Sequence, residues 1–283
     1  MKLINGTKIA RKITSGLKKE IGKLKSKPHL AVILVGNDAA SKLYVSLKEK
    51  KAAEIGVAFS KHLFSPSVDA GEVVNLIKEL NEDEKVSGII VQLPLPPFFD
   101  PDKIINTIAP EKDVDGFCEK NRKNLLAGKE LTLKPVLPQA FLEILRSVKI
   151  KLAGKKVAAV VNSEIFGKTL AAVFEQENAR CDYLVKKVCL DKGLEDFLRE
   201  ADVVISATGC PGLIKGGMIK QGATLLDAGV SREGKKTRGD VDAQSVEKKA
   251  AYLTPTPLGV GPVTVAMLLA NVFLAFKNKN GGN

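Results

Sequence analysis

Short apolar runs recur along the chain, separated by longer segments with a different periodicity. Each run contains four to seven apolar residues in a row, rich in Val, Ile, Leu and Ala. Uninterrupted runs of this length are typical of strands buried on both faces of a parallel sheet. The runs lie within Leu30–Gly36, Gly88–Pro96, Lys156–Val161, Asp202–Gly209 and Ala223–Gly229.

Helical periodicity fills the segments between these runs. Thr7 is placed to cap a first helix, and Ser41–Ile55 reads as a second helix closed by Gly56 at its C′ position. The apolar face of the first helix carries Ile9, Ile13, Leu17 and Ile21. Further helical segments are Gly71–Leu80, Gln139–Ser147 and Gly167–Gln176.

Alternating strands and helices predict an α/β protein with mainly parallel sheets. Residues 116–137 interrupt the alternation, because they are charged and show no clear period. A chain of 283 residues has room for two domains at about 100–200 residues each, so we place the domain boundary in this segment. The second series opens with a strand, a tight turn and a helix, which is typical of a nucleotide-binding unit.

The last apolar segment, Val260–Phe276, carries no charge over seventeen residues. It contains Gly, Pro, Thr and Asn, and it is shorter than the roughly twenty strongly apolar residues that span a bilayer. We therefore predict a buried helix. The first residues of the chain contain no apolar stretch of the kind found in signal peptides, so secretion is not expected.

Composition narrows the possible chemistry. There are 44 Lys and Arg against 32 Asp and Glu, and the resulting formal charge of +12 favours anionic partners. Two histidines, His29 and His62, are too few for a His-rich zinc site, and none of the four cysteines forms a CxxC pair, so we expect no metal site. Scattered cysteines in a chain of this length predict reduced thiols and a cytoplasmic protein.

Ligands in open α/β sheets bind beyond the carboxyl ends of the strands, so polar residues at those ends are candidates. Gln92 follows an apolar run, where its amide is costly to bury unless it is paired, and a functional or a structural role fits equally. Asp113 and Asp115 precede Gly116. They indicate either an Asx-capped turn or a carboxylate that binds a ring NH and an exocyclic amine, as a pterin or guanine offers.

Tyr44 and Lys48 are four residues apart and share one face of a predicted helix. An aromatic ring beside an ammonium group can stack on a flat ligand while the lysine moves a proton. The alternative is a solvated lysine on a helix that is rich in lysine.

Two further segments could bind a ligand through their backbone. Val160–Leu170 indicates a strand, a short turn and a helix with Gly167, which suits a phosphate at a helix N-terminus, although the motif is not GxGxxG. Thr254–Thr264 has three prolines and two glycines in eleven residues, and predicts a rigid loop that opens the last helix at Pro262.

Together these segments resemble the bifunctional methylenetetrahydrofolate dehydrogenase/cyclohydrolase family. The motifs YxxxK, QLPLP, DVDG, GDVD and TPxPxGVGPxT occur in order and span almost the whole chain. The resemblance implies two α/β domains with folate between them and a last helix that returns to the first domain. Residues 1–117 plus 262–283 would form the folate-binding catalytic domain, and residues 135–261 a Rossmann-like dinucleotide-binding domain. Homodimers are usual in the family.

The resemblance also implies the reaction and the roles of single residues. The family oxidises 5,10-methylenetetrahydrofolate by hydride transfer to NADP and hydrolyses the methenyl product to 10-formyltetrahydrofolate. Tyr44 would stack on the pterin ring, and Lys48 would be the catalytic lysine, tuned by Gln92. Asp115 would anchor the pterin edge, and Pro262 would line the same cleft. The polyglutamylated tail of folate suits the positive charge of the chain without any nucleic acid.

The cofactor side departs from the family pattern. Its expected contact positions are Asn162, Ser163, Gly167 and Val230. The family usually has Gly-Arg-Ser where this chain has Val161-Asn162-Ser163, so the arginine expected to pair with the 2′-phosphate of NADP is absent. Lys186 or Lys187 could supply a substitute charge, and NAD is possible in place of NADP.

Three hypotheses remain open on the sequence alone. The first is the bifunctional enzyme with NADP or NAD. The second is a cyclohydrolase or folate-binding protein whose dehydrogenase half is impaired. The third, a nucleic-acid-binding protein, is disfavoured because the chain shows no basic cluster interleaved with aromatic residues.

Overall fold

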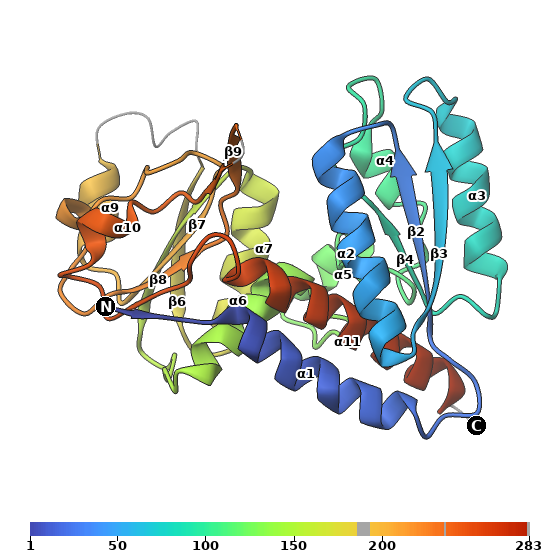
Figure 1. The fold of residues 1–283 in the computed structure, drawn as a ribbon, viewed down its shortest axis with the longest axis horizontal. Helices are drawn as coiled ribbons and strands as arrows, with labels where there is room; N and C mark the ends of the chain where they lie inside the picture. Colours follow the sequence, from blue (N-terminus) through green and yellow to red (C-terminus); the bar gives the residue numbers. More distant parts are fainter. Residues whose placement is uncertain (186–192, 235, 282–283) are drawn as a thin grey trace. The chain divides into compact units, whose positions relative to one another are not determined.

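A computed structural model describes residues 1–185, 193–234 and 236–281 of the chain. These residues form two compact units (Figure 1). The six-stranded unit comprises Met1–Ala10 and Leu137–Thr264, and the three-stranded unit comprises Arg11–Val136 and Val265–Asn283. Three helices run across the unit boundaries, namely α1 (Gly6–Ile21), α6 (Val136–Ser147) and α11 (Val260–Asn280).

The three-stranded unit is built on a parallel sheet with the order β3-β2-β4 (Figure 1). Its strands are β2 (His29–Val35), β3 (Ala58–Phe64) and β4 (Gly88–Val91). Its own helices are α2 (Ala39–Ile55), α3 (Ala70–Glu82), α4 (Pro101–Ile105) and α5 (Glu119–Leu126).

Alternate residues of β2 enter two different cores, since Val32 packs with α2 and α11 whereas Ile33 packs with α3 and α4. This two-sided burial explains the uninterrupted apolar run of β2.

The six-stranded unit contains a parallel sheet with the order β1-β11-β8-β7-β5-β6. Its strands are β1 (Lys2–Leu3), β5 (Lys156–Val161), β6 (Arg180–Val185), β7 (Val203–Ala207), β8 (Thr224–Asp227) and β11 (Tyr252–Leu253). Its helices include α7 (Glu164–Glu175), α9 (Leu194–Arg199) and α10 (Ala243–Val246), with a 3₁₀ turn at Gly216–Met218. The antiparallel strands β9 (Ser231–Glu233) and β10 (Lys236–Arg238) form a separate two-stranded sheet.

The order of this sheet reverses at β5. The chain passes from β5 to β6 on one side and returns to β7 on the other side. In doubly wound folds such a reversal opens a crevice beyond the carboxyl ends of the two central strands, where dinucleotides bind. The predicted α/β class with mainly parallel sheets is confirmed.

The ends of the predicted helices show which local signals were read correctly. Gly56 ends α2 in the left-handed conformation, with φ of 87°, as predicted. The predicted cap of the first helix is wrong, because Asn5 and not Thr7 accepts the backbone N–H of Lys8, over 2.9 Å. Helix α2 begins two residues earlier than predicted, because Asp38 caps it by accepting the N–H of Ser41.

The first residues of the chain group with a different unit from the one predicted. Strand β1 pairs in parallel with β11, so residues 1–10 lie with the six-stranded unit, whereas the sequence analysis placed them in the first domain.

Helix α11 is long and apolar enough to cross a membrane, but 56% of its apolar window is buried within the protein. Leu269 and Val272 of this helix lie in the core of the three-stranded unit, which confirms the predicted buried helix.

Three cysteines lie in the described part of the chain, and all are free thiols: Cys118, Cys181 and Cys210. Burial raises the pKa of Cys118 and of Cys181 to about 12, so both remain protonated and unreactive at neutral pH. Cys189 lies outside the described residues.

Candidate active site

Lys48 and Gln92 meet in the three-stranded unit. Lys48 projects from α2, and its Nζ donates a hydrogen bond of 2.9 Å to Oε1 of Gln92, the residue that follows β4. The amide nitrogen of Gln92 donates in turn to the carbonyl of Leu93 over 2.7 Å. Two hydrogen bonds thus satisfy this partly buried polar side chain and fix the orientation of its amide. The predicted pairing of Gln92 with Lys48 is present in the structure.

The electrostatics of Lys48 depend on burial and on Asp115. Removal from water lowers the pKa of Lys48, and the negative charge of Asp115 opposes that shift. Burial raises the pKa of Asp115 to about 6, with Lys48 opposing the shift and Asp113 adding to it. A lysine with a lowered pKa and a carboxyl with a raised pKa thus influence one another electrostatically, which is a setting for proton transfer.

Asp113, rather than Asp115, forms the turn that the DVDG motif predicted. Its carboxylate accepts backbone N–H groups from Gly116 at 3.0 Å, from Phe117 at 3.2 Å and from Cys118 at 2.8 Å. The side chain of Asn121 donates to the same carboxylate. No hydrogen bond joins the carboxylate of Asp115 to the described residues, so it is free to bind a ligand. The reading as a capped turn thus applies to Asp113, and the reading of Asp115 as a ligand-binding carboxylate stays a prediction.

Tyr44 precedes Lys48 by one helical turn of α2 and is 37% exposed. The neighbouring Leu43 and Leu47 are also exposed, so this surface of α2 offers apolar contact next to the lysine. Such a surface can take a flat ring. Pro262, in the first turn of α11, lies in the six-stranded unit and not in the unit of Lys48.

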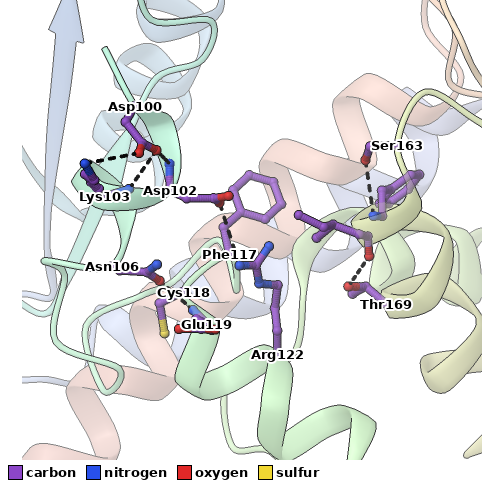
Figure 2. Close-up of polar contacts among 12 residues, drawn as sticks. Asp100, Asp102, Lys103, Asn106, Phe117, Cys118, Glu119, Arg122, Ser163 and Thr169 are labelled. Atoms are coloured by element: carbon purple, nitrogen blue, oxygen red, sulfur yellow. Dashed lines mark hydrogen bonds and ion pairs between the residues drawn. The ribbon is translucent and has the colours of Figure 1, made fainter.

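The predicted cofactor residues follow the carboxyl ends of β5 and β8. Ser163 caps α7, because its Oγ accepts the N–H of Phe166 over 3.2 Å; Figure 2 shows this contact and the bond of Thr169 to the helix backbone. Asn162 is exposed in the turn before the cap, and Val230 follows β8 with 48% of its surface exposed. Backbone and polar groups here face solvent beyond the point where the strand order reverses.

Gly167 has a packing role that the sequence did not reveal. A β-carbon at this position would lie 2.3 Å from Cδ2 of Tyr183 on β6. The glycine therefore lets α7 and β6 approach each other across the aromatic ring, as the last glycine of a Rossmann motif does. Lys186 and Lys187, the possible substitute charges, lie outside the described residues.

Two buried aspartates hold the loops after β7 and β8. Asp240 accepts hydrogen bonds from the hydroxyls of Ser206 and Thr208 and from the backbone N–H of Thr208. Asp227 accepts the N–H groups of Gly229, Asp240 and Val241, and burial raises its pKa to about 6. Sequence reasoning missed these roles, although Asp227 ends an apolar run in the same way as Gln92.

Comparison with known proteins identifies the two units. Residues 4–115 match the catalytic domain model of tetrahydrofolate dehydrogenase/cyclohydrolase, and residues 135–280 match its NAD(P)-binding domain model. The chain belongs to this family. It is 42% identical over 282 residues to the bifunctional protein FolD of Geotalea uraniireducens, covering 98% of this chain and 99% of that protein.

Solved structures agree with this assignment. The FolD methylenetetrahydrofolate dehydrogenase/cyclohydrolase of Campylobacter jejuni superposes with a TM-score of 0.93 at 37% identity, covering 98% of this chain and 99% of that one. The Trypanosoma brucei enzyme, solved with NADP and an inhibitor, gives a TM-score of 0.91 at 33% identity, covering 98% and 97%. The chain is therefore a folate enzyme with a catalytic domain and an NAD(P)-binding domain.

Proposed function

We propose that this chain catalyses both reactions of its family through the site described above. It oxidises 5,10-methylenetetrahydrofolate to the methenyl form with NADP or NAD, and it hydrolyses that product to 10-formyltetrahydrofolate. The observation that carries the proposal is the hydrogen bond between Lys48 and Gln92 beside a free Asp115. All three residues lie within the segment that matches the catalytic domain model.

The binding roles follow from the chemistry of each side chain. A pterin presents a flat ring, which suits the exposed ring of Tyr44, and an edge with two N–H donors, which suits the carboxylate of Asp115. Asp115 makes no competing bond to the described residues, so both of its oxygens are available to the substrate. Pro262, in the first turn of α11, is a further proposed folate contact that rests on the family resemblance.

Lys48 is the general base in this proposal. The methenyl intermediate is a cation, and a charged ammonium beside it is unfavourable. The lowered pKa of Lys48 favours the neutral amine, which removes a proton as water attacks the methenyl carbon. Gln92 accepts an N–H of Lys48 and so directs the nitrogen lone pair. The bond between N5 and the carbon then breaks as the protonated Lys48 returns its proton to N5. The hydroxyl of the adduct loses its proton to water, and the carbonyl that forms stays on N10 as the formyl group.

The six-stranded unit would hold the dinucleotide beyond β5, β7 and β8. Its exposed turn at Asn162 and Ser163 fits a nucleotide sugar and phosphate, since backbone and polar groups face solvent there. The nicotinamide ring, when bound, takes up the hydride. NADP is the cofactor in the T. brucei relative, but Asn162 offers no positive charge to a 2′-phosphate, so we propose that NAD is used at least comparably.

The remaining assignments rest on the family resemblance. We propose a cytoplasmic homodimer that accepts folates with polyglutamate tails, for which the formal charge of +12 is favourable. Sedimentation velocity distinguishes the monomer from the dimer, and a series of substrates with tails of increasing length tests the preference for polyglutamate.

The decisive experiment measures the two reactions separately on one purified preparation. Hydrolysis is followed by the loss of methenyltetrahydrofolate absorbance, and oxidation by the formation of NADH or NADPH. The proposal expects both activities. Hydrolysis without oxidation by either cofactor would favour the enzyme with an impaired dehydrogenase half. Absence of both activities and of folate binding, with steeply salt-dependent binding to DNA, would favour the nucleic-acid hypothesis.

A further inference from the structure

Glu164 is held in a fixed position at the start of α7. The hydroxyl of Tyr183 on β6 donates a hydrogen bond of 2.8 Å to its Oε1. The ammonium of Lys168, one helical turn further along, lies 3.4 Å from the same oxygen. Gly167 makes this arrangement possible, because any side chain there would displace the ring of Tyr183. A carboxylate is thus anchored between the first turn of α7 and β6.

Helix α7 and strand β6 lie at the part of the sheet where a Rossmann-like unit binds the adenosine ribose. Tyr183 pairs with Ala159 in the register of β6 on β5, two residues before β6 ends. In Rossmann-like units the adenosine ribose lies beyond this pair of strands, and an acidic residue about 20 residues after the glycine turn binds its 2′-hydroxyl. Here a carboxylate reaches the same strand pair from the helix, two residues after Asn162.

Glu164 carries a negative charge and has one carboxylate oxygen without a partner among the described residues. The bond from Tyr183, with the nearby Lys168, holds the pKa of Glu164 below its usual range, so the group is ionised at neutral pH. Both contacts in the described part of the chain use Oε1, which leaves Oε2 to accept another hydrogen bond. The side chain of Glu164 is 58% exposed, so a ligand can reach it.

We propose that Glu164 determines which dinucleotide the enzyme prefers. Its free oxygen accepts a hydrogen bond from the ribose 2′-hydroxyl of NAD, and its charge repels the 2′-phosphate of NADP. The inference rests on the dinucleotide site proposed above and adds a discriminating group to it. Lys168 acts in the same direction, because its ammonium lies 3.4 Å from the Glu164 carboxylate, whose charge offsets part of its attraction for a phosphate.

Two substitutions separate the elements of this proposal. Glu164→Gln removes the charge and releases Lys168. Tyr183→Phe keeps the ring on Gly167 but removes the bond that anchors the carboxylate. Glu175→Gln, an exposed glutamate at the far end of α7, is the matched control for the change in net charge. Calorimetric titration of each protein with NAD, NADP and 2′-deoxy-NAD gives the dissociation constants.

The proposal expects the ratio of NAD to NADP affinity to fall about tenfold or more in Glu164→Gln, by less in Tyr183→Phe, and not at all in Glu175→Gln. The parent should bind NAD more tightly than 2′-deoxy-NAD, and this difference should shrink in Glu164→Gln, because the two changes remove the same hydrogen bond. Parent and Glu164→Gln proteins that bind both dinucleotides with the same ratio would overturn the inference but leave the cofactor site intact. A parent that binds neither dinucleotide would overturn both.

Discussion

The side-chain amide of Asn271 donates a hydrogen bond of 2.8 Å to the carbonyl of Val114, although the two residues are 157 positions apart. The same amide donates to the carbonyl of Lys134 over 2.9 Å. Asn271 is 3% exposed and lies on α11, so the last helix fixes the backbone next to Asp115. Asp113 fixes that segment from the other side through the N–H groups of the following turn.

Asn271→Ala is therefore expected to destabilise the protein and to weaken folate binding together. The buried carbonyl of Val114 would lose this donor, at about 1–3 kcal/mol for an unsatisfied buried group, and the partly buried carbonyl of Lys134 would lose one at a smaller cost. Urea unfolding gives the stability, and titration with a folate analogue gives the affinity. Asn278→Ala, an exposed position on the same helix, is the control and should change neither. Unchanged stability of Asn271→Ala would show that these two bonds are dispensable.

Lys48→Met should abolish hydrolysis of methenyltetrahydrofolate while the fold is kept. A general base contributes about 10²–10⁴-fold, and methionine has a similar length without a proton acceptor of that kind. Initial rates and a circular dichroism spectrum of the purified variant provide the test. Lys50→Met, on an exposed position of α2, controls for lost charge. Hydrolysis above a tenth of the parent rate in Lys48→Met would exclude this lysine as the base.

Asp115→Ala and Asp113→Ala are expected to have opposite signatures. The first should weaken the binding of a folate analogue by about 1.5–3 kcal/mol, leave dinucleotide binding unchanged and cost little stability, because Asp115 makes no side-chain bond to the described residues. The second should lower the free energy of unfolding, because several donors lose their acceptor. Titration and urea unfolding of both variants separate the two roles. An unchanged folate affinity in Asp115→Ala would reduce this residue to part of the turn.

We expect His29 and His62 to make the folded protein less stable in acid. Ser60 lies between them, 3.0 Å from Nε2 of His29 and 3.2 Å from Nε2 of His62. Burial lowers the pKa of both rings below 6.5, with Asp83 opposing the shift at His29 and His62 adding to it. The unfolded chain then binds more protons than the native state, so stability falls as pH drops below about 6.5.

The raised pKa values of Asp115 and Asp227, both about 6, change the stability with pH in the opposite direction from the two histidines. These carboxyls bind protons more readily in the folded state, so their contribution is largest in acid and is lost as pH rises through about 6. A variant that combines His29→Asn with His62→Gln isolates the histidine part. Its free energy of unfolding should decline less than that of the parent between pH 7.5 and pH 5.5. Parallel pH profiles would rule out the histidine contribution.

The sequence predicted what local patterns encode. The apolar run of β2 and the glycine that ends α2 are local signals, and both were read correctly. Strand β1 could not be predicted, because two residues give no period and their partner, β11, lies some 250 positions away. The packing role of Gly167 could not be predicted either, because Tyr183, the residue that requires a glycine there, lies on the next strand. Likewise, spacing alone does not reveal which aspartate of DVDG forms the turn.

The turn before α7 has Asn162 where the family pattern has an arginine. Asn162 is exposed in the turn before α7 and carries no charge, so the 2′-phosphate of NADP gains no bidentate partner there. Asn162→Arg is expected to raise NADP affinity selectively by about 1.5–3 kcal/mol, provided that the new side chain is free to bind the phosphate. Dissociation constants for NADP and NAD, measured on the parent and on the variant, test this expectation.

Glu164 should limit the gain in NADP affinity that Asn162→Arg produces. An arginine introduced at position 162 can pair with this carboxylate, two residues away, and part of its charge is then spent within the protein. The gain in NADP affinity from Asn162→Arg should therefore be larger in the Glu164→Gln background than in the parent, and the two substitutions should not be additive. Additive effects would mean that the two groups act independently. A parent that already prefers NADP about a hundredfold would contradict the idea, and would direct attention to Lys186 and Lys187.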